Sequence, residues 1–241
     1  MLAVHDLHRS RLEAAGIPSR KIRVVLNSPD PRIFSQLARS LPTQRTGEEK
    51  FTIICHGTIA RRLGLDVAFD AMDLLRERLP GARLEILGSG DYLATARTRV
   101  DAMKLQQRVS FLPPVLIEAL PAALKHADVG LVPNLPSAAT HLMLPVKMLE
   151  FATLGIPIIA ARRRAIEHYF GASAARFFEA GNSADLAAAI VDLSTNARRR
   201  AQLACRASEI AEALSWPRQL QLYFDAVDSL LSGGVAERRK I

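Results

Sequence analysis

Short apolar runs alternate with helix-like patterns from Phe51 to the end of this chain. The runs at 51–57, 82–90, 108–115, 127–133 and 156–161 are bounded by Gly or Pro, as buried strands are. Between them, apolar residues at helical spacing predict helices over 62–79, 91–103, 117–126 and 145–154. This alternation predicts an α/β fold with a Rossmann-like, doubly wound parallel sheet and right-handed crossovers.

The segments on either side of this alternation are less regular. Before it, the pattern predicts a helix over 1–16 and a strand over 22–26, which cannot close a parallel sheet by themselves. After it, we expect a helix over 164–169, a strand over 176–178, and helices over 183–193, 196–214 and 216–231. Residues 39–50 are polar and aperiodic and therefore predict a linker. The predicted divisions are 1–38, the linker 39–50, a main domain over 51–214, and a terminal helix and tail over 215–241.

The segment 141–161 carries the strongest local signals. Pro145 suits the first turn of a helix, Gly155 suits its C-terminal cap, and the apolar run that follows predicts a strand. A helix that begins at the mouth of a parallel sheet presents free backbone N–H groups to an anion such as phosphate. Lys147 and Glu150 share one face of this helix. They point into a common crevice or form an ordinary surface ion pair, and spacing alone does not decide between the two.

Charge and composition narrow the class of protein. The formal net charge of +8 suits nucleic acid, an anionic membrane surface or phosphorylated small molecules. The aromatic content of 5% leaves few side chains for stacking on bases, so we expect no nucleic-acid partner. The chain has no apolar stretch long enough to span a bilayer and starts without a signal-peptide core, so we expect a cytoplasmic protein.

Individual motifs are weak. Gly88-Ser89-Gly90 follows a predicted strand, as a phosphate-binding turn does, but a tight turn without a ligand fits equally well. His56 ends a predicted strand beside Gly57, where it either touches a ligand or packs in the core. The other histidines are scattered, which argues against a metal site.

The ordered set of turns is more specific than any one of them. The segments CHGTIARRLGLD, LEILGSGD, RVSFLPPV, ADVGLVPN and LPVKMLEFATLGIPIIA, preceded by NSPDPRIF, resemble the C-terminal, donor-binding domain of the GT-B glycosyltransferases of group 1. The resemblance extends over about residues 3–232. It implies the predicted Rossmann-like fold, and it implies that 1–38 is a remnant of an N-terminal acceptor domain.

The resemblance also implies roles for particular residues around a nucleoside diphosphate sugar. Arg62 and Lys147 would be the catalytic cations that stabilise the departing diphosphate. Glu150 would bind the ribose hydroxyls, and Leu142 stands where the family often has a second carboxylate. The remaining donor-binding positions are the loop residues Gly57, Thr58, Gly88 and Gly90 and the base-binding turn from Pro113 to Val115. The backbone of the segment Met143, Leu144, Pro145 and Val146 would face the diphosphate.

The implied reaction is transfer of a sugar with retention at the anomeric carbon, with the nucleotide sugar as donor substrate and no metal or other cofactor. The acceptor site and a catalytic histidine would belong to the N-terminal domain, so we expect a truncated or split enzyme that is inactive alone unless a separate chain supplies that domain. Its place would be the cytoplasm, with peripheral association at the inner face of the membrane. The alternative is a non-catalytic module that binds a nucleotide sugar or a protein partner.

Overall fold

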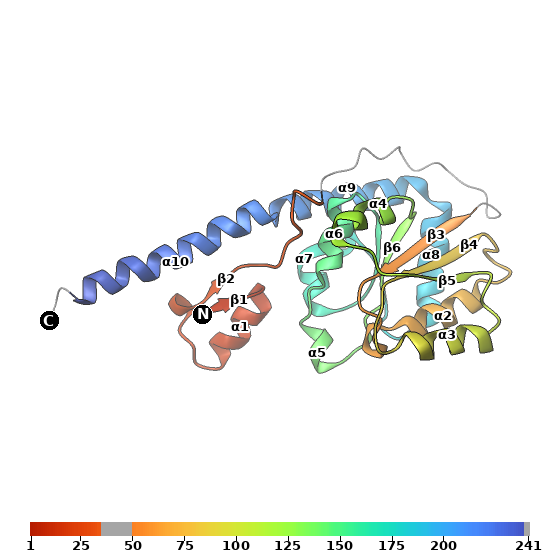
Figure 1. The fold of residues 1–241 in the computed structure, drawn as a ribbon, viewed down its shortest axis with the longest axis horizontal. Helices are drawn as coiled ribbons and strands as arrows, with labels where there is room; N and C mark the ends of the chain where they lie inside the picture. Colours follow the sequence, from red (N-terminus) through yellow and green to blue (C-terminus); the bar gives the residue numbers. More distant parts are fainter. Residues whose placement is uncertain (35–49, 239–241) are drawn as a thin grey trace.

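A six-stranded parallel sheet forms the centre of the computed structural model, which describes residues 1–34 and 50–238 (Figure 1). Its strands are β3 (Phe51–His56), β4 (Ala82–Leu87), β5 (Val109–Leu112), β6 (Val129–Val132), β7 (Ile158–Ala161) and β8 (Arg176–Phe178). The order is β5-β4-β3-β6-β7-β8, so the chain builds outward from β3 and then returns to its other side. In such sheets ligands bind where the order reverses, at the carboxyl ends of the strands.

Helices cover both faces of the sheet (Figure 1). Their bounds are α2 (Leu65–Leu74), α3 (Leu93–Ala102), α4 (Leu120–Leu124), α5 (Ala138–His141), α6 (Val146–Thr153), α7 (Arg164–Ala174), α8 (Ser183–Thr195) and α9 (Ala197–Ala213). One core lies between the sheet and α2, α3 and α8, and the other lies between the sheet and α4, α6, α7 and α9. Two-sided burial explains why the strands read as continuous apolar runs.

The predicted doubly wound sheet is confirmed, with differences at the ends of helices. The helix expected over 62–79 is a 3-10 turn, η2 (Arg61–Leu63), followed by α2, because Gly64 adopts a left-handed conformation with φ +79° between them. A side chain at Gly64 would place its Cβ 2.0 Å from the Pro133 carbonyl oxygen. The loops after β3 and β6 therefore touch at a position that only glycine fits.

The N-terminal residues form a small separate sheet. β1 (Leu2–Ala3) pairs in parallel with β2 (Arg23–Val24), with α1 (Asp6–Ala14) and the turn η1 (Ser19–Lys21) between them. The sequence prediction was wrong in giving this segment one strand, because a two-residue strand has no recognisable period. The predicted linker lies outside the described residues except for Lys50.

The last helix, α10 (Trp216–Arg238), is long and extends beside this N-terminal sheet (Figure 1). Gln219 Oε1 accepts a 2.9 Å hydrogen bond from the Leu26 amide. Further along, α10 exposes Leu222, Phe224 and Leu230. Within the described ranges, no helix has both the length and the apolar character needed to cross a bilayer.

Candidate functional site

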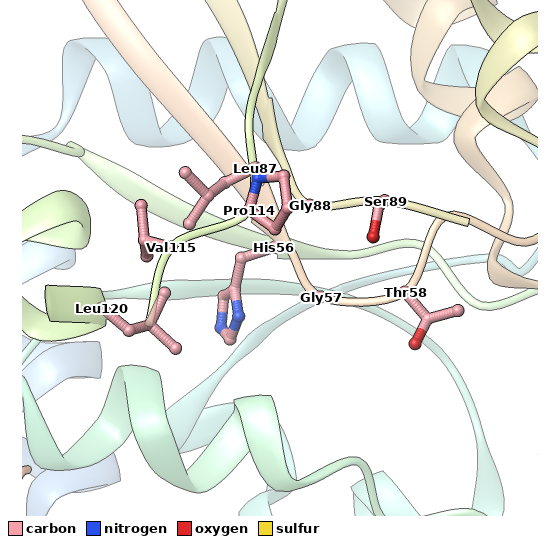
Figure 2. Close-up of a pocket in the computed structure, with 9 residues that line it drawn as sticks. All are labelled: His56, Gly57, Thr58, Leu87, Gly88, Ser89, Pro114, Val115 and Leu120. Carbon is pink, nitrogen blue, oxygen red and sulfur yellow. The ribbon is translucent and has the colours of Figure 1, made fainter. Parts of the chain in front are cut away.

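A cleft of about 260 Å³ opens at the carboxyl ends of β3, β4 and β5 (Figure 2). Three strand ends and one helix line it: His56, Gly57 and Thr58 at the end of β3, Leu87, Gly88 and Ser89 at the end of β4, Pro114 and Val115 after β5, and Leu120 of α4. The three loops meet here because parallel strands end at the same edge of the sheet. The position agrees with the reversal of strand order beside β3.

Glycine allows the first two loops to pack closely. Gly57 and Gly88 have φ values of +102° and +146°. A Cβ on Gly88 would lie 2.0 Å from the Gly57 carbonyl oxygen, and one on Gly90 would lie 2.1 Å from that of Ile59. The Gly57 amide donates a 2.9 Å hydrogen bond to the Leu87 carbonyl. The Gly88-Ser89-Gly90 turn is therefore required for loop packing, whatever else it does.

Lys147 brings a positive charge to the edge of this cleft. It lies in the first turn of α6, and its Nζ donates a hydrogen bond to the carbonyl oxygen of His56. A Cβ on Gly57 would lie 3.5 Å from the same Nζ. The first-turn N–H groups of α6 lack intrahelical acceptors, so the ammonium and the helix N-terminus together favour an anion.

Glu150 lies one turn further along α6, and its partner is also His56. Glu150 Oε2 is 3.3 Å from His56 Nε2, and the His56 ring packs edge-on against Phe151 with centroids 4.9 Å apart. The geometry between these two atoms is not that of a hydrogen bond, and among the described residues His56 Nε2 has no hydrogen-bond partner. The pair therefore keeps hydrogen-bonding capacity for a bound molecule.

Burial controls the charges of this pair. Desolvation, assisted by the Lys147 ammonium, lowers the pKa of His56 to about 3, so its ring is neutral at pH 7. Desolvation raises the pKa of Glu150 to about 7, and Lys147 acts in the opposite direction. Glu150 is thus divided between carboxylate and carboxylic acid near neutral pH.

The predicted pairing of Lys147 and Glu150 takes a different form in the structure. Both reach His56, one at its carbonyl and the other at its ring, and the part of the chain that the structure describes has no ion pair between them. Among the two readings left open by the sequence, the geometry favours side chains that share a crevice, because both are partly buried.

The predicted loop residues divide into two groups. Gly57, Thr58, Gly88 and Val115 line the cleft. Pro113 and Gly90 lie next to lining residues without lining it themselves. Arg62 is exposed on η2 and lies outside the lining, and its carbonyl accepts a hydrogen bond from the Leu135 amide at 3.0 Å.

The turn before α6 departs from the expectation that its backbone amides face an anion. The Met143 N–H donates to the Thr140 carbonyl at 3.2 Å, and Pro145, the N-terminal cap of α6, has no N–H. The buried Asn134 after β6 holds Met143 by donating to its sulfur at 3.6 Å. Because proline has no N–H, the backbone N–H groups left for a ligand are those of Leu144, Val146 and Lys147.

His56 is the residue whose place the sequence left undecided. It is 5% exposed, lines the cleft and contacts both Lys147 and Glu150. Its position directly before a loop glycine at a strand end was the available signal. Among the described residues, no group of three or more His, Cys, Asp or Glu side chains lies close enough to hold a metal ion.

Comparison with known proteins gives a consistent result. Residues 50–196 match the family described as "Glycosyl transferases group 1". The chain is 32% identical over 134 residues to a GDP-mannose-dependent alpha-(1-6)-phosphatidylinositol monomannoside mannosyltransferase of Mycobacterium tuberculosis, a match covering 55% of this chain and 34% of the relative. It is 25% identical over 167 residues to the amylovoran biosynthesis glycosyltransferase AmsK of Erwinia amylovora, covering 69% and 40%. The matches thus span less than half the length of either relative.

Solved structures agree on the fold. The crystal structure of HepE from Anabaena in complex with UDP superposes with a TM-score of 0.77 at 16% sequence identity, covering 96% of this chain and 63% of HepE. At that identity the likeness concerns the fold, which is the Rossmann-like sheet with helices on both faces described above.

Proposed function

The chain belongs to the group 1 glycosyltransferases, and on this premise we propose that residues 51–214 bind a nucleoside diphosphate sugar for transfer of its sugar to an acceptor. The observation that carries the proposal is that Lys147 and Glu150 of α6 both contact His56, a residue that lines the cleft at the carboxyl end of β3. An anion-attracting helix start and a buried carboxylate in one crevice match the two chemistries of a nucleotide, its phosphates and its ribose hydroxyls.

The proposed arrangement places each part of the donor against a part of the cleft. The diphosphate lies between the Gly57 loop and the start of α6, where Lys147 and the free amides neutralise the charge that develops as the diphosphate departs. Glu150 accepts hydrogen bonds from the ribose hydroxyls, with the neutral His56 ring beside it. The base lies against the turn from Pro113 to Val115. Arg62 is exposed and takes part only if its side chain reaches over the loop.

The proposal extends to the stereochemistry of transfer, the acceptor-binding part and membrane association. Transfer proceeds with retention and without a metal, as in the family that the sequence resembles. The acceptor-binding part comes from residues beyond those matched here, in the same polypeptide or in a separate chain, and transfer by these 241 residues alone is not expected. The net charge of +8 suits peripheral association with an anionic membrane at its cytoplasmic face.

Calorimetric titration with UDP, GDP and ADP tests the donor site without requiring catalysis. We expect at least one to bind, and we expect Glu150→Ala to weaken that binding about tenfold because the ribose loses a charged acceptor. Glu77→Ala removes an exposed carboxylate from the turn after α2 and serves as the matched control. Absence of binding by all three nucleotides at millimolar concentration, or equal losses in both variants, would overturn the proposal.

A further inference from the structure

A second hollow, of about 570 Å³, lies between α1 and α5, away from the cleft described above. Figure 1 shows α1 facing α5 across this region. Arg11 of α1, His141 of α5 and Arg163 after β7 line it together with Leu142 and Ser137. The described residues of its lining therefore carry two permanent positive charges and an imidazole, and they include no carboxylate.

Arg163 is the buried member of this group. The residue is 8% exposed, and its Nε has no hydrogen-bond partner among the described residues. One of its terminal nitrogens donates to His141 Nδ1 at 3.4 Å. Within the part of the chain that the structure describes, no carboxylate forms an ion pair with it. A guanidinium carries five N–H donors, so a buried one with so few partners is costly unless an anion completes its shell.

His141 contributes a donor to the same hollow. Arginine can only donate, so the Arg163–His141 contact requires that His141 Nδ1 accept. The imidazole proton is then on Nε2, and this N–H is left to donate to a ligand. Arginine and an imidazole N–H together favour an oxyanion, and arginine in particular matches the geometry of phosphate.

The N-terminal segment is fixed in place over this hollow. The ring of His5 contacts the Leu142 carbonyl through Nε2 at 2.5 Å, and the hydroxyl of Tyr169 on α7 donates to Asp6 at 2.8 Å. Asp6 is therefore bonded to Tyr169, and the nearby carboxylate of Glu167 is bonded to Arg162. Glu13, which is closer in sequence to Arg11, is bonded to Arg9. All three carboxylates have their partners outside the lining, and among the described residues none of them forms an ion pair with Arg11 or Arg163.

We propose that this hollow binds a phosphate group carried by the acceptor substrate. Leu142 lines this hollow, and the turn that it begins leads into α6, whose Lys147 contacts His56 of the nucleotide cleft. An acceptor held by its phosphate between Arg11 and Arg163 then lies on the same side of the sheet as the start of α6, where we propose that the donor diphosphate binds. The assignment of this ligand to the acceptor rests on the proposed function. The anion site itself rests on Arg163 and its surroundings alone.

Calorimetry with three probes tests the site: glucose 6-phosphate, inorganic phosphate and glucose, each titrated into the 241-residue chain at low ionic strength. We expect glucose 6-phosphate to bind, inorganic phosphate to bind more weakly and glucose not to bind. Arg163→Gln should weaken glucose 6-phosphate binding roughly tenfold or more, because a charged hydrogen-bond donor is lost. Arg164→Gln removes the same charge from the exposed neighbouring residue and should leave the affinity unchanged.

Arg11→Gln keeps the test valid if Arg163→Gln does not fold, because Arg11 is exposed on α1 and its replacement leaves the core intact. It should also weaken the binding of glucose 6-phosphate. Equal losses in Arg163→Gln and Arg164→Gln, or no loss in Arg11→Gln, would overturn the anion site. Equal affinities for inorganic phosphate and glucose 6-phosphate would overturn its assignment to the acceptor.

Titration of the same variants with the nucleoside diphosphate separates this inference from the donor site. We expect Arg163→Gln to bind the nucleotide like the wild type. A parallel loss of nucleotide binding would place Arg163 in the donor site and overturn the acceptor assignment. If no nucleotide binds the wild type while glucose 6-phosphate binding depends on Arg163, the donor proposal fails and the anion site stands.

Discussion

Glu150 on α6 and His56 at the end of β3 face each other with 3.3 Å between Oε2 and Nε2. Both are largely buried, and burial acts on them in opposite directions, raising the pKa of the acid to about 7 and lowering that of the base to about 3. The pair is therefore close to uncharged at slightly acidic pH. An acid whose ionisation lies near neutrality, inside a cleft, is typical of a functional position.

Nucleotide binding should depend on pH through Glu150. The carboxylate accepts the ribose hydroxyls, and the carboxylic acid accepts them less well. With a pKa of about 7, the ionised fraction falls roughly tenfold between pH 8 and pH 6, and the affinity should fall with it. Calorimetry across this range measures the dependence. Glu150→Gln removes the titrating group, so a variant that keeps the full pH dependence would contradict the assignment.

Glu150→Gln should also stabilise the folded chain at alkaline pH. A carboxyl group whose pKa is raised by folding costs stability above the folded value, and the cost vanishes below the unfolded value of 4.5. We expect a gain on the order of 2 kcal/mol in the free energy of unfolding at pH 8, shrinking towards pH 4.5. Urea denaturation at both pH values measures it. A difference that is the same at both would show that packing, rather than charge, is responsible.

The two predicted cations should differ in importance. Lys147 contacts the loop at the cleft, whereas Arg62 is exposed outside the lining. Lys147→Met should weaken nucleoside diphosphate binding about tenfold and leave binding of the corresponding nucleoside nearly unchanged, since the nucleoside lacks the phosphates. Arg62→Gln should reduce diphosphate binding by less. An Arg62 effect as large as that of Lys147 would show that Arg62 reaches the phosphates.

Gly88→Ala should unfold or strongly destabilise the loops of the cleft. The new Cβ would lie 2.0 Å from the Gly57 carbonyl oxygen, and the backbone has φ +146°. Gly181 has φ +88°, but a Cβ added there would meet no described atom within 4 Å, so Gly181→Ala isolates backbone strain. We expect a loss of about 1 kcal/mol for Gly181→Ala and roughly 3 kcal/mol for Gly88→Ala. Similar losses in urea denaturation would mean that the loops separate easily.

Much of the fold was predictable because its signals are local. A strand buried on both faces must be apolar throughout, and each of the predicted runs between Phe51 and Ala161 became a strand of the sheet. Pro145 and Gly155 bracket α6 as expected, with Pro145 as its N-terminal cap. The order of the turns also carried the resemblance to group 1 glycosyltransferases, because motifs in order are more specific than any one motif.

The sequence by itself thus determined the alternation of elements, the family and the edge of the sheet where a site belongs. Only the tertiary structure decided that His56 meets Glu150, that Gly64 interrupts the helix after β3, and that Arg163 is buried beside His141. These relationships join side chains far apart in the chain. They depend on how helices pack over the sheet and how closely neighbouring loops approach, and neither quantity leaves a periodic signal in the sequence.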